Sequence, residues 1–202
     1  MREHPIFARC YDWLARKMAP IEEEYRRELV SGLRGRVLEV GAGTGLNFKL
    51  YPPEADVVAL EPEPNMARTA MGRRADAPSP VRLVRGAAER LPFRDQAFDA
   101  VVVSLVLCSV RSAERAASEI RRVLRPDGEL RIFEHVRSTD PGHARWQDRL
   151  TPIWGVFSGG CHPNRDAAAT LQASGFDVDV RRIPIGPASP ARPHILGVAT
   201  PR

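Results

Sequence analysis

The stretch that decides the fold is Arg36-Val-Leu-Glu-Val-Gly-Ala-Gly-Thr-Gly45. A short run of β-branched and aliphatic residues leads directly into three glycines at alternating positions, Gly41, Gly43 and Gly45. Glycine adopts positive φ freely and lets a ligand approach the bare backbone, so a strand that runs into such a turn is typical of a nucleotide-binding loop. The spacing is G-x-G-x-G, and Leu46 stands where the dinucleotide fingerprint has its last glycine. This spacing indicates a nucleoside ligand without a pyrophosphate.

The length and composition predict one globular domain. The chain has 202 residues, of which 43% are hydrophobic and 27% charged, within the usual globular range. No stretch approaches the roughly 20 apolar residues of a membrane span, and the N-terminus lacks the apolar core of a signal peptide. We therefore expect a cytoplasmic protein without a transmembrane segment.

The net charge of +5 is carried by arginines that are scattered among 25 acidic residues. Because a nucleic-acid surface needs clustered basic residues, we expect no nucleic-acid partner. The three cysteines, Cys10, Cys108 and Cys161, are far apart in sequence and show no metal-ligand spacing. They indicate reduced thiols, with Cys108 as a buried structural one, and no metal site is predicted.

Strand-like and helix-like segments alternate along the chain. Apolar runs suited to buried parallel strands occur at 36–40, 56–60, 81–85, 98–103 and 129–135, with helix-like stretches at 64–74 and 112–124 and a turn signal at Pro126-Asp127-Gly128. This order predicts an α/β three-layer sandwich around a mostly parallel sheet.

The two ends of the chain differ from this core. Residues 164–174 are predicted to form a helix with Asn164 as N-cap and Gly175 as its stop. Two strand-like segments follow, at 176–183 and 194–200, and their helix-free connection favours an antiparallel pair at the sheet edge. These bring the predicted sheet to seven strands. Residues 5–31 are predicted to form two helices broken at Pro20, which could lie across the carboxyl edge of the sheet and cover a ligand.

Three further segments place polar or small residues at the same edge. Glu61 follows the second strand-like run, twenty residues beyond Gly41, where a carboxylate accepts hydrogen bonds from both ribose hydroxyls. The small residues of 86–88, with Glu89 beside them, suit the close approach of a flat ring. Residues 104–106 end the fourth strand-like run, at the edge where open α/β sheets bind ligands.

In this order the four elements resemble the class I S-adenosylmethionine-dependent methyltransferases, particularly those of ubiquinone and menaquinone biosynthesis. The resemblance is carried by Glu39-Val-Gly-Ala-Gly-Thr-Gly45, Glu61-Pro62, Leu91-Pro92-Phe93 with Phe98-Asp99, and Arg122-Val-Leu-Arg-Pro-Asp-Gly128. It implies a Rossmann-like fold that binds S-adenosylmethionine and releases S-adenosylhomocysteine.

Further segments resemble the methyltransferase-like thiol S-methyltransferases of animal membranes. They are Asn47-Phe48 with Tyr51-Pro52-Pro53, Leu105-Val-Leu-Cys-Ser-Val110, Phe133-Glu-His-Val136, Gly160-Cys161 with Arg165, and Arg192-Pro-His-Ile-Leu-Gly197. We expect no hydrophobic N-terminal anchor of the kind those proteins carry, and Glu61 stands where they usually have Asp. The resemblance implies a small alkyl thiol as methyl acceptor.

The resemblance also implies roles for individual residues. It divides the single domain of residues 1–202 into an N-terminal helical lid (1–34), a cofactor-binding core (35–136), and an acceptor-side insertion with closing strands (137–202). The residues expected to bind the cofactor are Tyr11, Glu39, Gly41, Ala42, Gly43, Thr44, Gly45, Asn47, Glu61, Pro62, Met66, Gly86, Ala87, Ala88, Glu89, Ser104, Leu105 and Val106.

The candidate general base is His135, at the end of the fifth strand-like run, because an imidazole accepts a proton from a thiol or phenol near neutral pH. Glu134 is expected to point to the other side of the strand. Methyl transfer needs no enzyme nucleophile, so the pair Cys161-His162 is not expected to be catalytic. The acceptor is expected to meet Trp146, Trp154, Arg165 and His194.

Several alternatives stay open. Within the methyltransferases, the acceptor could be a small amine, a phenol or quinone, or a lipid head group. A nicotinamide-dependent oxidoreductase or a non-catalytic nucleoside-binding module would keep the fold. A methyltransferase for amino groups in DNA is disfavoured, because Ser104-Leu105-Val106-Leu107 stands where such enzymes carry an Asp/Asn-Pro-Pro-Tyr/Phe signature. The oligomeric state is not predicted.

Overall fold

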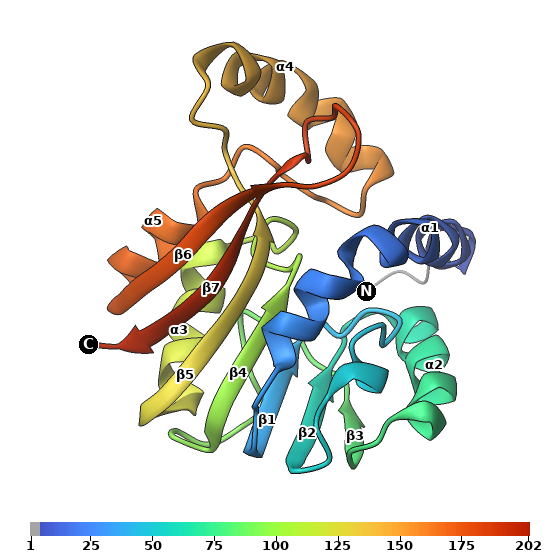
Figure 1. The fold of residues 1–202 in the computed structure, drawn as a ribbon, viewed down its shortest axis with the longest axis vertical. Helices are drawn as coiled ribbons and strands as arrows, with labels where there is room; N and C mark the ends of the chain where they lie inside the picture. The colour runs from blue at the N-terminus through green and yellow to red at the C-terminus, as the bar shows by residue number, and fades with distance from the viewer. Residues whose placement is uncertain (1–4) are drawn as a thin grey trace.

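A computed structural model describes the backbone of residues 5–202, and the side chains from residue 17 onward except that of residue 19 (Figure 1). The elements are α1 (Pro5–Val30), β1 (Gly35–Val40), η1 (Phe48–Leu50), β2 (Ala55–Leu60), α2 (Pro64–Arg73), η2 (Arg74–Asp76), β3 (Val81–Val84), β4 (Phe98–Ser104), α3 (Ala113–Val123), β5 (Leu124–His135), α4 (Pro141–Phe157), α5 (Ala167–Ala173), β6 (Phe176–Pro184) and β7 (Pro193–Pro201).

The strands form one seven-stranded sheet in the order β3-β2-β1-β4-β5-β7-β6. Strands β1 to β5 pair in parallel, and β7 runs antiparallel to both of its neighbours, β5 and β6. The order reverses at β1 and β4, whose carboxyl ends lie side by side. In open α/β sheets such a switch point is where ligands bind. The predicted fold class is confirmed, including the antiparallel strand near the C-terminus.

Alternation along the strands builds a core on each face of the sheet. Leu38 and Val101 face one core, together with residues of α3 and α5. Their neighbours Val37 and Val102 face the other core, with the end of α1 and with η1. Helix α4 stands beyond the carboxyl edge, away from both layers (Figure 1). The edge between α1 and α4 is therefore where a ligand site can form.

The predicted break at Pro20 is wrong, because residues 5–30 form one helix with Pro20 inside it. An internal proline removes one backbone hydrogen bond and can kink a helix without ending it. Figure 1 shows α1 changing direction along its course. Within the described part of the chain, no helix combines the length and apolar composition that a membrane crossing requires.

Two predicted boundaries also differ. Residues Pro126–Gly128 fall inside the bounds of β5, where the register with β4 shifts between the Phe98–Leu124 and Ala100–Glu129 pairs, so the expected turn is an irregularity in the strand. Helix α5 is capped by Asp166, whose side chain accepts from the Ala169 N–H. Asn164 instead donates to Asp148 across to α4. The predicted stop at Gly175 is confirmed by its φ of +87°.

Candidate functional site

All three glycines of the turn after β1 have a positive φ, and two of them also lack room for a side chain. Gly41, Gly43 and Gly45 have φ of +66°, +58° and +80°. A Cβ on Gly41 would come within 2.7 Å of the Val106 side chain, and one on Gly45 within 2.7 Å of the Phe48 ring. A Cβ on Gly43 would meet nothing within 4 Å. The turn is thus packed at both ends and open at Gly43, where a ligand can reach the bare backbone. Ala42 and Thr44 flank this opening.

Glu61, at the end of β2, fastens this turn to the neighbouring strand. Its carboxylate accepts from the Gly43 N–H and from the Glu63 N–H, each at 2.8 Å. Burial raises the pKa of Glu61 to about 7, although both backbone hydrogen bonds act against the shift. Each carboxylate oxygen carries two lone pairs, so one on each remains for a ribose hydroxyl. Pro62 follows in the chain, and Met66 lies buried in α2.

A buried polar chain runs beside the turn from the helix that covers it. Asn47 donates to Glu39 at 2.8 Å and accepts from Arg26 of α1 at 3.0 Å. Arg26 also donates to the Ser104 hydroxyl at 3.0 Å and pairs with Glu22 at 2.7 Å. The predicted residues Glu39, Asn47 and Ser104 are therefore joined by two residues that the sequence analysis missed, Glu22 and Arg26. Their only local signal is a Glu–Arg spacing of four on one helix.

Three buried oxygens at this place lack a hydrogen-bond partner among the described residues: Glu39 Oε2, Thr44 Oγ1 and the Tyr51 hydroxyl. Burial raises the pKa of Glu39 to about 7, while the hydrogen bond from Asn47 and the proximity of the Tyr51 hydroxyl oppose this shift. Buried polar atoms in native proteins are normally satisfied. An unpaired acceptor beside an open glycine turn fits a ligand that brings N–H or O–H donors, as S-adenosylmethionine does.

The segment expected beside the base lies at the next strand end. Gly86, Ala87 and Glu89 are half-buried and Ala88 is buried. Ala87 bridges to Arg90, and Glu89 accepts from the Arg111 N–H at 2.9 Å, which ties the segment to the loop after β4. A cavity of about 600 Å³ adjoins it, lined by Arg85, Gly86, Arg90, Leu91, Pro92 and Phe93.

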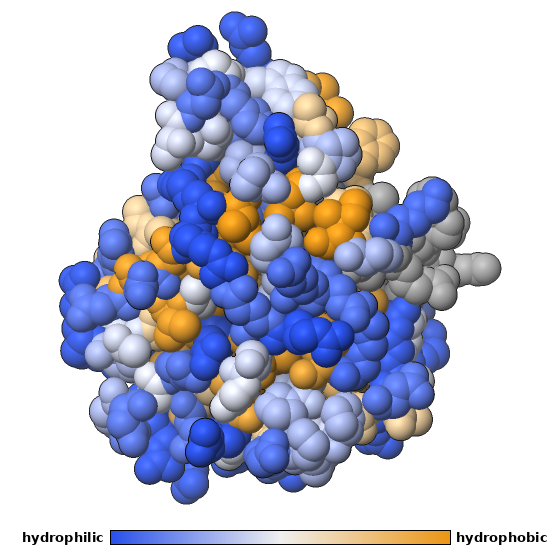
Figure 2. Space-filling model, viewed as in Figure 1, coloured by the Kyte–Doolittle hydropathy of each residue, from blue (hydrophilic) through white to orange (hydrophobic). Residues whose placement is uncertain are grey.

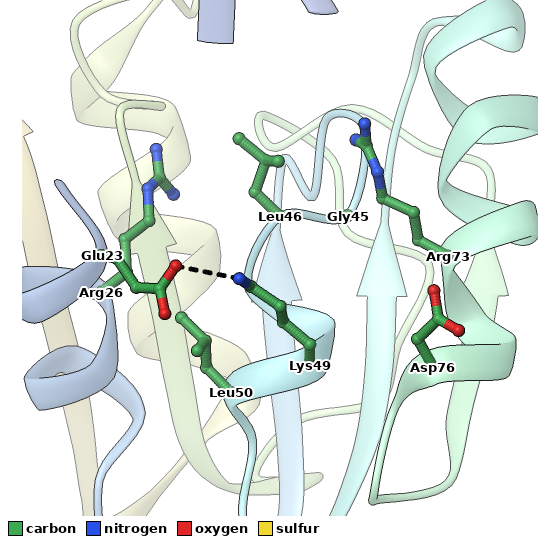
Figure 3. A pocket seen from close by; sticks show the side chains of 8 residues that line it. All are labelled: Glu23, Arg26, Gly45, Leu46, Lys49, Leu50, Arg73 and Asp76. Carbon is green, nitrogen blue, oxygen red and sulfur yellow. Dashed lines mark hydrogen bonds and ion pairs between the residues drawn. The ribbon is translucent and has the colours of Figure 1, made fainter. Parts of the chain in front are cut away.

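A second cavity, of about 300 Å³, lies on the outer side of the glycine turn, between α1 and α2 (Figure 3). Arginine and lysine side chains from three elements surround it, and Lys49 pairs with Glu23 at 2.9 Å. Its lining residues are Glu23, Arg26, Gly45, Leu46, Lys49, Leu50, Arg73 and Asp76. Only Gly45 of this set belongs to the predicted cofactor residues.

Leu105 and Val106 lie in the loop that leaves β4. Leu105 has a φ of +60°, which is rare for a residue with a Cβ. Its N–H donates to the Phe133 carbonyl at 2.8 Å. Backbone strain of this kind costs about 1–3 kcal/mol and tends to occur at functional sites. Here it turns the loop toward Gly41, which Val106 contacts.

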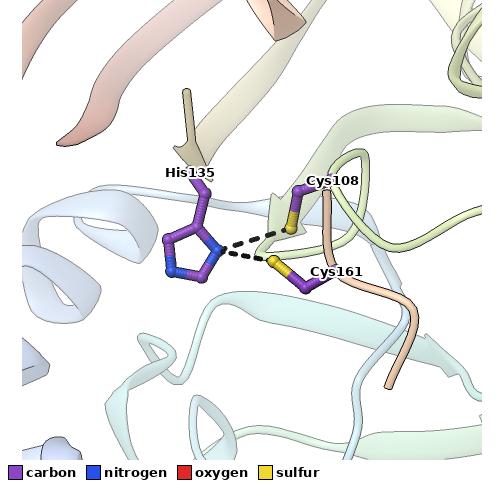
Figure 4. A group of neighbouring side chains, drawn as sticks. All are labelled: Cys108, His135 and Cys161. Atoms are coloured by element: carbon purple, nitrogen blue, oxygen red, sulfur yellow. Dashed lines mark hydrogen bonds between the residues drawn. The ribbon is translucent and has the colours of Figure 1, made fainter. Parts of the chain in front are cut away.

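The predicted base, His135, lies at the end of β5 against two thiols (Figure 4). Its Nδ1 is 3.5 Å from Cys108 Sγ and 3.4 Å from Cys161 Sγ. Burial lowers the pKa of His135, but its hydrogen bond and charge interaction with Cys161 and the charge of Glu134 raise it more, so the net shift is upward. Interaction with Cys108 and His135 lowers the pKa of the Cys161 thiol to about 5. The sequence analysis missed this grouping entirely.

Glu134 is fully buried and holds the loop after β4. Its carboxylate accepts from the backbone N–H groups of Val106, Leu107 and Cys108 at 2.6, 2.8 and 3.3 Å. Burial raises its pKa to about 7, against these hydrogen bonds. The residue next to the candidate base therefore fixes the backbone of the loop that carries Cys108.

Of the four predicted acceptor residues, the structure brings His194 to His135 and Trp154 to Cys161. The His194 ring lies 4.5 Å from that of His135, and its Nε2 is buried without a described partner. The indole of Trp154 helps to lower the pKa of Cys161.

The other predicted contacts lie elsewhere. Arg165 donates to the carbonyls of Leu107 and Val110, so it braces the loop. Trp146 is 39% exposed and lies 5.4 Å from the His143 ring, with no described contact to His135. The side chain of Tyr11 lies outside the described residues.

Comparison with known proteins finds methyltransferases. The family model described as "Methyltransferase domain" matches residues 38–132. The human thiol S-methyltransferase TMT1B is 34% identical over 192 residues, covering 88% of this chain and 78% of that protein. Human thiol S-methyltransferase TMT1A is 36% identical over 188 residues, covering 86% and 77%.

Among solved structures, a SAM-dependent methyltransferase of Thermotoga maritima superposes with a TM-score of 0.71 at 21% identity, covering 98% of this chain and 99% of that one. This likeness supports the fold. The family is shown by the two human thiol S-methyltransferases, which at 34% and 36% identity cover at least 77% of either chain: this chain belongs to the class I S-adenosylmethionine-dependent methyltransferases.

Proposed function

We propose that this methyltransferase acts on a small-molecule thiol. The observation that carries the proposal is His135, which stands at the carboxyl end of β5 beside the loop that contacts the glycine turn. The names of the two human relatives point to the same acceptor class. Amines, phenols or quinones, and lipid head groups are the competing acceptors.

S-adenosylmethionine supplies a methyl group on a sulfonium, which is already an activated leaving group. The chain's own task is then to orient the acceptor and exclude water, which contributes up to about 7–11 kcal/mol. We assign the cofactor's ribose to Glu61 and its methionyl part to the turn of residues 41–45, Glu39 and Asn47. Helix α1 covers this edge of the sheet, and its Arg26 fastens it there by hydrogen bonds to Asn47 and Ser104.

The acceptor sulfur must lose its proton, because the thiolate is the nucleophilic form. A thiol with a pKa of about 8.5 needs only modest help at neutral pH. We place His135 in this role as the predicted catalytic residue. On the far side of the ring from the two sulfurs, its Nε2 has no hydrogen-bond partner among the described residues (Figure 4).

The test is a product screen by mass spectrometry with alkyl thiols, aryl thiols, catechols and primary amines. We expect methyl thioethers and S-adenosylhomocysteine in equal amounts. Replacing His135 by alanine should lower kcat by about 10²–10⁴-fold, while the thermal shift caused by S-adenosylhomocysteine stays. The matched control is His143→Ala, which removes an imidazole on α4. Methylation of amines or catechols with none of any thiol would reject the proposal.

A shift of the melting temperature with NADH and none with S-adenosylhomocysteine would favour an oxidoreductase. A cytoplasmic location stays a prediction from the sequence.

A further inference from the structure

Three metal-ligating side chains meet where β4, β5 and the segment after α4 converge. Cys108 Sγ, His135 Nδ1 and Cys161 Sγ all lie within 4.8 Å of one another. Both cysteines are buried and His135 is half-buried. Figure 4 shows both sulfurs directed at the same nitrogen. Two cysteines and a histidine form one of the ligand sets that zinc uses in enzymes.

The spacing of these atoms fits a tetrahedral ion. With Zn–S bonds of about 2.3 Å and Zn–N bonds of about 2.0–2.1 Å, the S···N edge of a tetrahedron is about 3.5 Å long. The two S···N distances in the structure are 3.4 and 3.5 Å. An ion could therefore enter between the three atoms with little movement of the backbone.

Neighbouring residues hold the three ligands in place. Glu134, next to His135, accepts from the Cys108 N–H. His162, next to Cys161, donates its N–H to the Cys108 carbonyl at 2.7 Å. Arg165 adds hydrogen bonds to the carbonyls on both sides of Cys108. Such supporting contacts are characteristic of metal sites whose ligand orientation is fixed in advance.

The described residues supply three ligands and no fourth within the same reach. Structural zinc sites use four protein ligands, whereas catalytic sites keep one position open for water or substrate. The cluster is also two residues from Val106, which contacts Gly41 of the cofactor turn. This places the cluster close to the turn that we assign to the cofactor.

We propose that Cys108, His135 and Cys161 bind one Zn²⁺ and that the acceptor sulfur takes its open position. The choice of a thiol as fourth ligand rests on the proposed function. The acceptor sulfur then lies on the Nδ1 side of the His135 ring, and the ion replaces direct proton transfer to Nε2, so that His135 promotes thiolate formation as a ligand.

The chemistry balances without any redox step. When the ion binds, the two cysteine thiols release their protons to solvent. The acceptor thiol loses its proton to solvent as its sulfur binds the ion. The sulfur then forms a bond to the methyl carbon while the sulfonium S–C bond breaks, which yields a methyl thioether and S-adenosylhomocysteine. The thioether is neutral and a weaker ligand than the thiolate, so it leaves.

The first experiment measures metal binding alone. The full chain, purified with a phosphine reductant and freed of metal, is titrated with Co²⁺ and then Zn²⁺ and followed by absorption and elemental analysis. We expect about one ion per chain, with a thiolate-to-cobalt charge-transfer band that Zn²⁺ abolishes. Cys108→Ser, Cys161→Ser and His135→Ala should each weaken binding by more than the roughly 10–100-fold typical of losing a supporting residue. His143→Ala should bind as wild type does.

Folding of each variant is checked by its thermal shift with S-adenosylhomocysteine. The wild-type titration decides the matter even where a variant fails to fold. No Co²⁺ or Zn²⁺ uptake by the wild type overturns the proposal. A disulfide between Cys108 and Cys161 that persists in the presence of the reductant also overturns the proposal.

The second experiment separates the site from the function. Turnover of an alkyl thiol should fall at least tenfold on removal of the metal and return with Zn²⁺. Thiol methylation that proceeds equally without metal overturns the catalytic ion and leaves the proposed function intact. If the protein binds the ion but methylates only amines or phenols, the proposed function is refuted. The thiol as fourth ligand is then refuted as well, whereas the metal site itself is retained.

Discussion

The carboxyl of Glu61 should make cofactor binding depend on pH. In the free protein its pKa is about 7, since the group is buried and only 4% exposed. A ribose diol donates two hydrogen bonds to a carboxylate and favours its ionised form. Below pH 7, binding must therefore displace a proton from Glu61.

The size of the effect follows from this linkage. The dissociation constant of S-adenosylhomocysteine should rise about tenfold for each pH unit below the pKa, and level off above it. Relative to pH 8, binding should be about tenfold weaker at pH 6 and about 100-fold weaker at pH 5. If Glu39, whose pKa is also about 7, loses its proton too, the slope becomes steeper.

Isothermal titration calorimetry from pH 5 to 8 measures this profile. Glu61→Gln should bind S-adenosylhomocysteine weakly. Because the amide does not titrate, the logarithm of its dissociation constant should change with pH by one unit less per pH unit than in the wild type. The matched control is Glu54→Gln, which removes the charge of an exposed carboxylate and should keep the wild-type slope. A dissociation constant that is flat in the wild type, or an unchanged slope in Glu61→Gln, would refute the role assigned to Glu61.

Three further predictions concern the free protein and are checked by chemical denaturation. Because the pKa of Glu39 is raised in the folded protein, the wild type loses stability as pH rises through about 7. Glu39→Gln is always neutral, so its free energy of unfolding should increase relative to that of the wild type by up to about 3 kcal/mol between pH 5 and 8. A difference between the two proteins that stays constant with pH would contradict this. Arg26→Ala leaves the buried carboxylate of Glu22 unpaired and should lower the free energy of unfolding by about 3–5 kcal/mol. Arg27→Ala breaks an exposed ion pair and should lower it by less than about 1 kcal/mol. Equal losses would count against the buried network. Gly41→Ala combines a positive φ with a clash, whereas Gly43→Ala has a positive φ alone. The loss of free energy of unfolding should therefore be about 1–2 kcal/mol for Gly43→Ala, from left-handed strain, and larger for Gly41→Ala. A larger loss for Gly43→Ala would contradict this description of the turn.

Much of the fold is predictable from local patterns. The apolar runs, the glycine turn and Glu61 occur in an order that specifies a parallel sheet and its ligand edge. Each of these signals is local, because strand periodicity and the need of glycine for positive φ act within a few residues. The N-cap of the last helix was misjudged, since Asn164 and Asp166 are both good caps and only their tertiary partners separate them.

The remaining features depend on packing between distant parts of the chain. Arg26 reads as an ordinary surface arginine until α1 lies on the carboxyl edge and buries it against Asn47 and Ser104. Its role follows from how the helix docks, which no spacing in the sequence encodes.

The sequence by itself determined the nucleoside turn, the mostly parallel sheet that carries it and the methyltransferase family, whereas the order of the strands came from the structure. Only the tertiary structure brought Cys108 and Cys161 to His135, at separations of 27 and 26 residues. The physical reason is that a loop after one strand, the end of the next strand and the segment after α4 converge at one sheet edge. That convergence is a property of the packed chain, because it depends on which strands pair and on the hydrogen bonds that fasten their loops together.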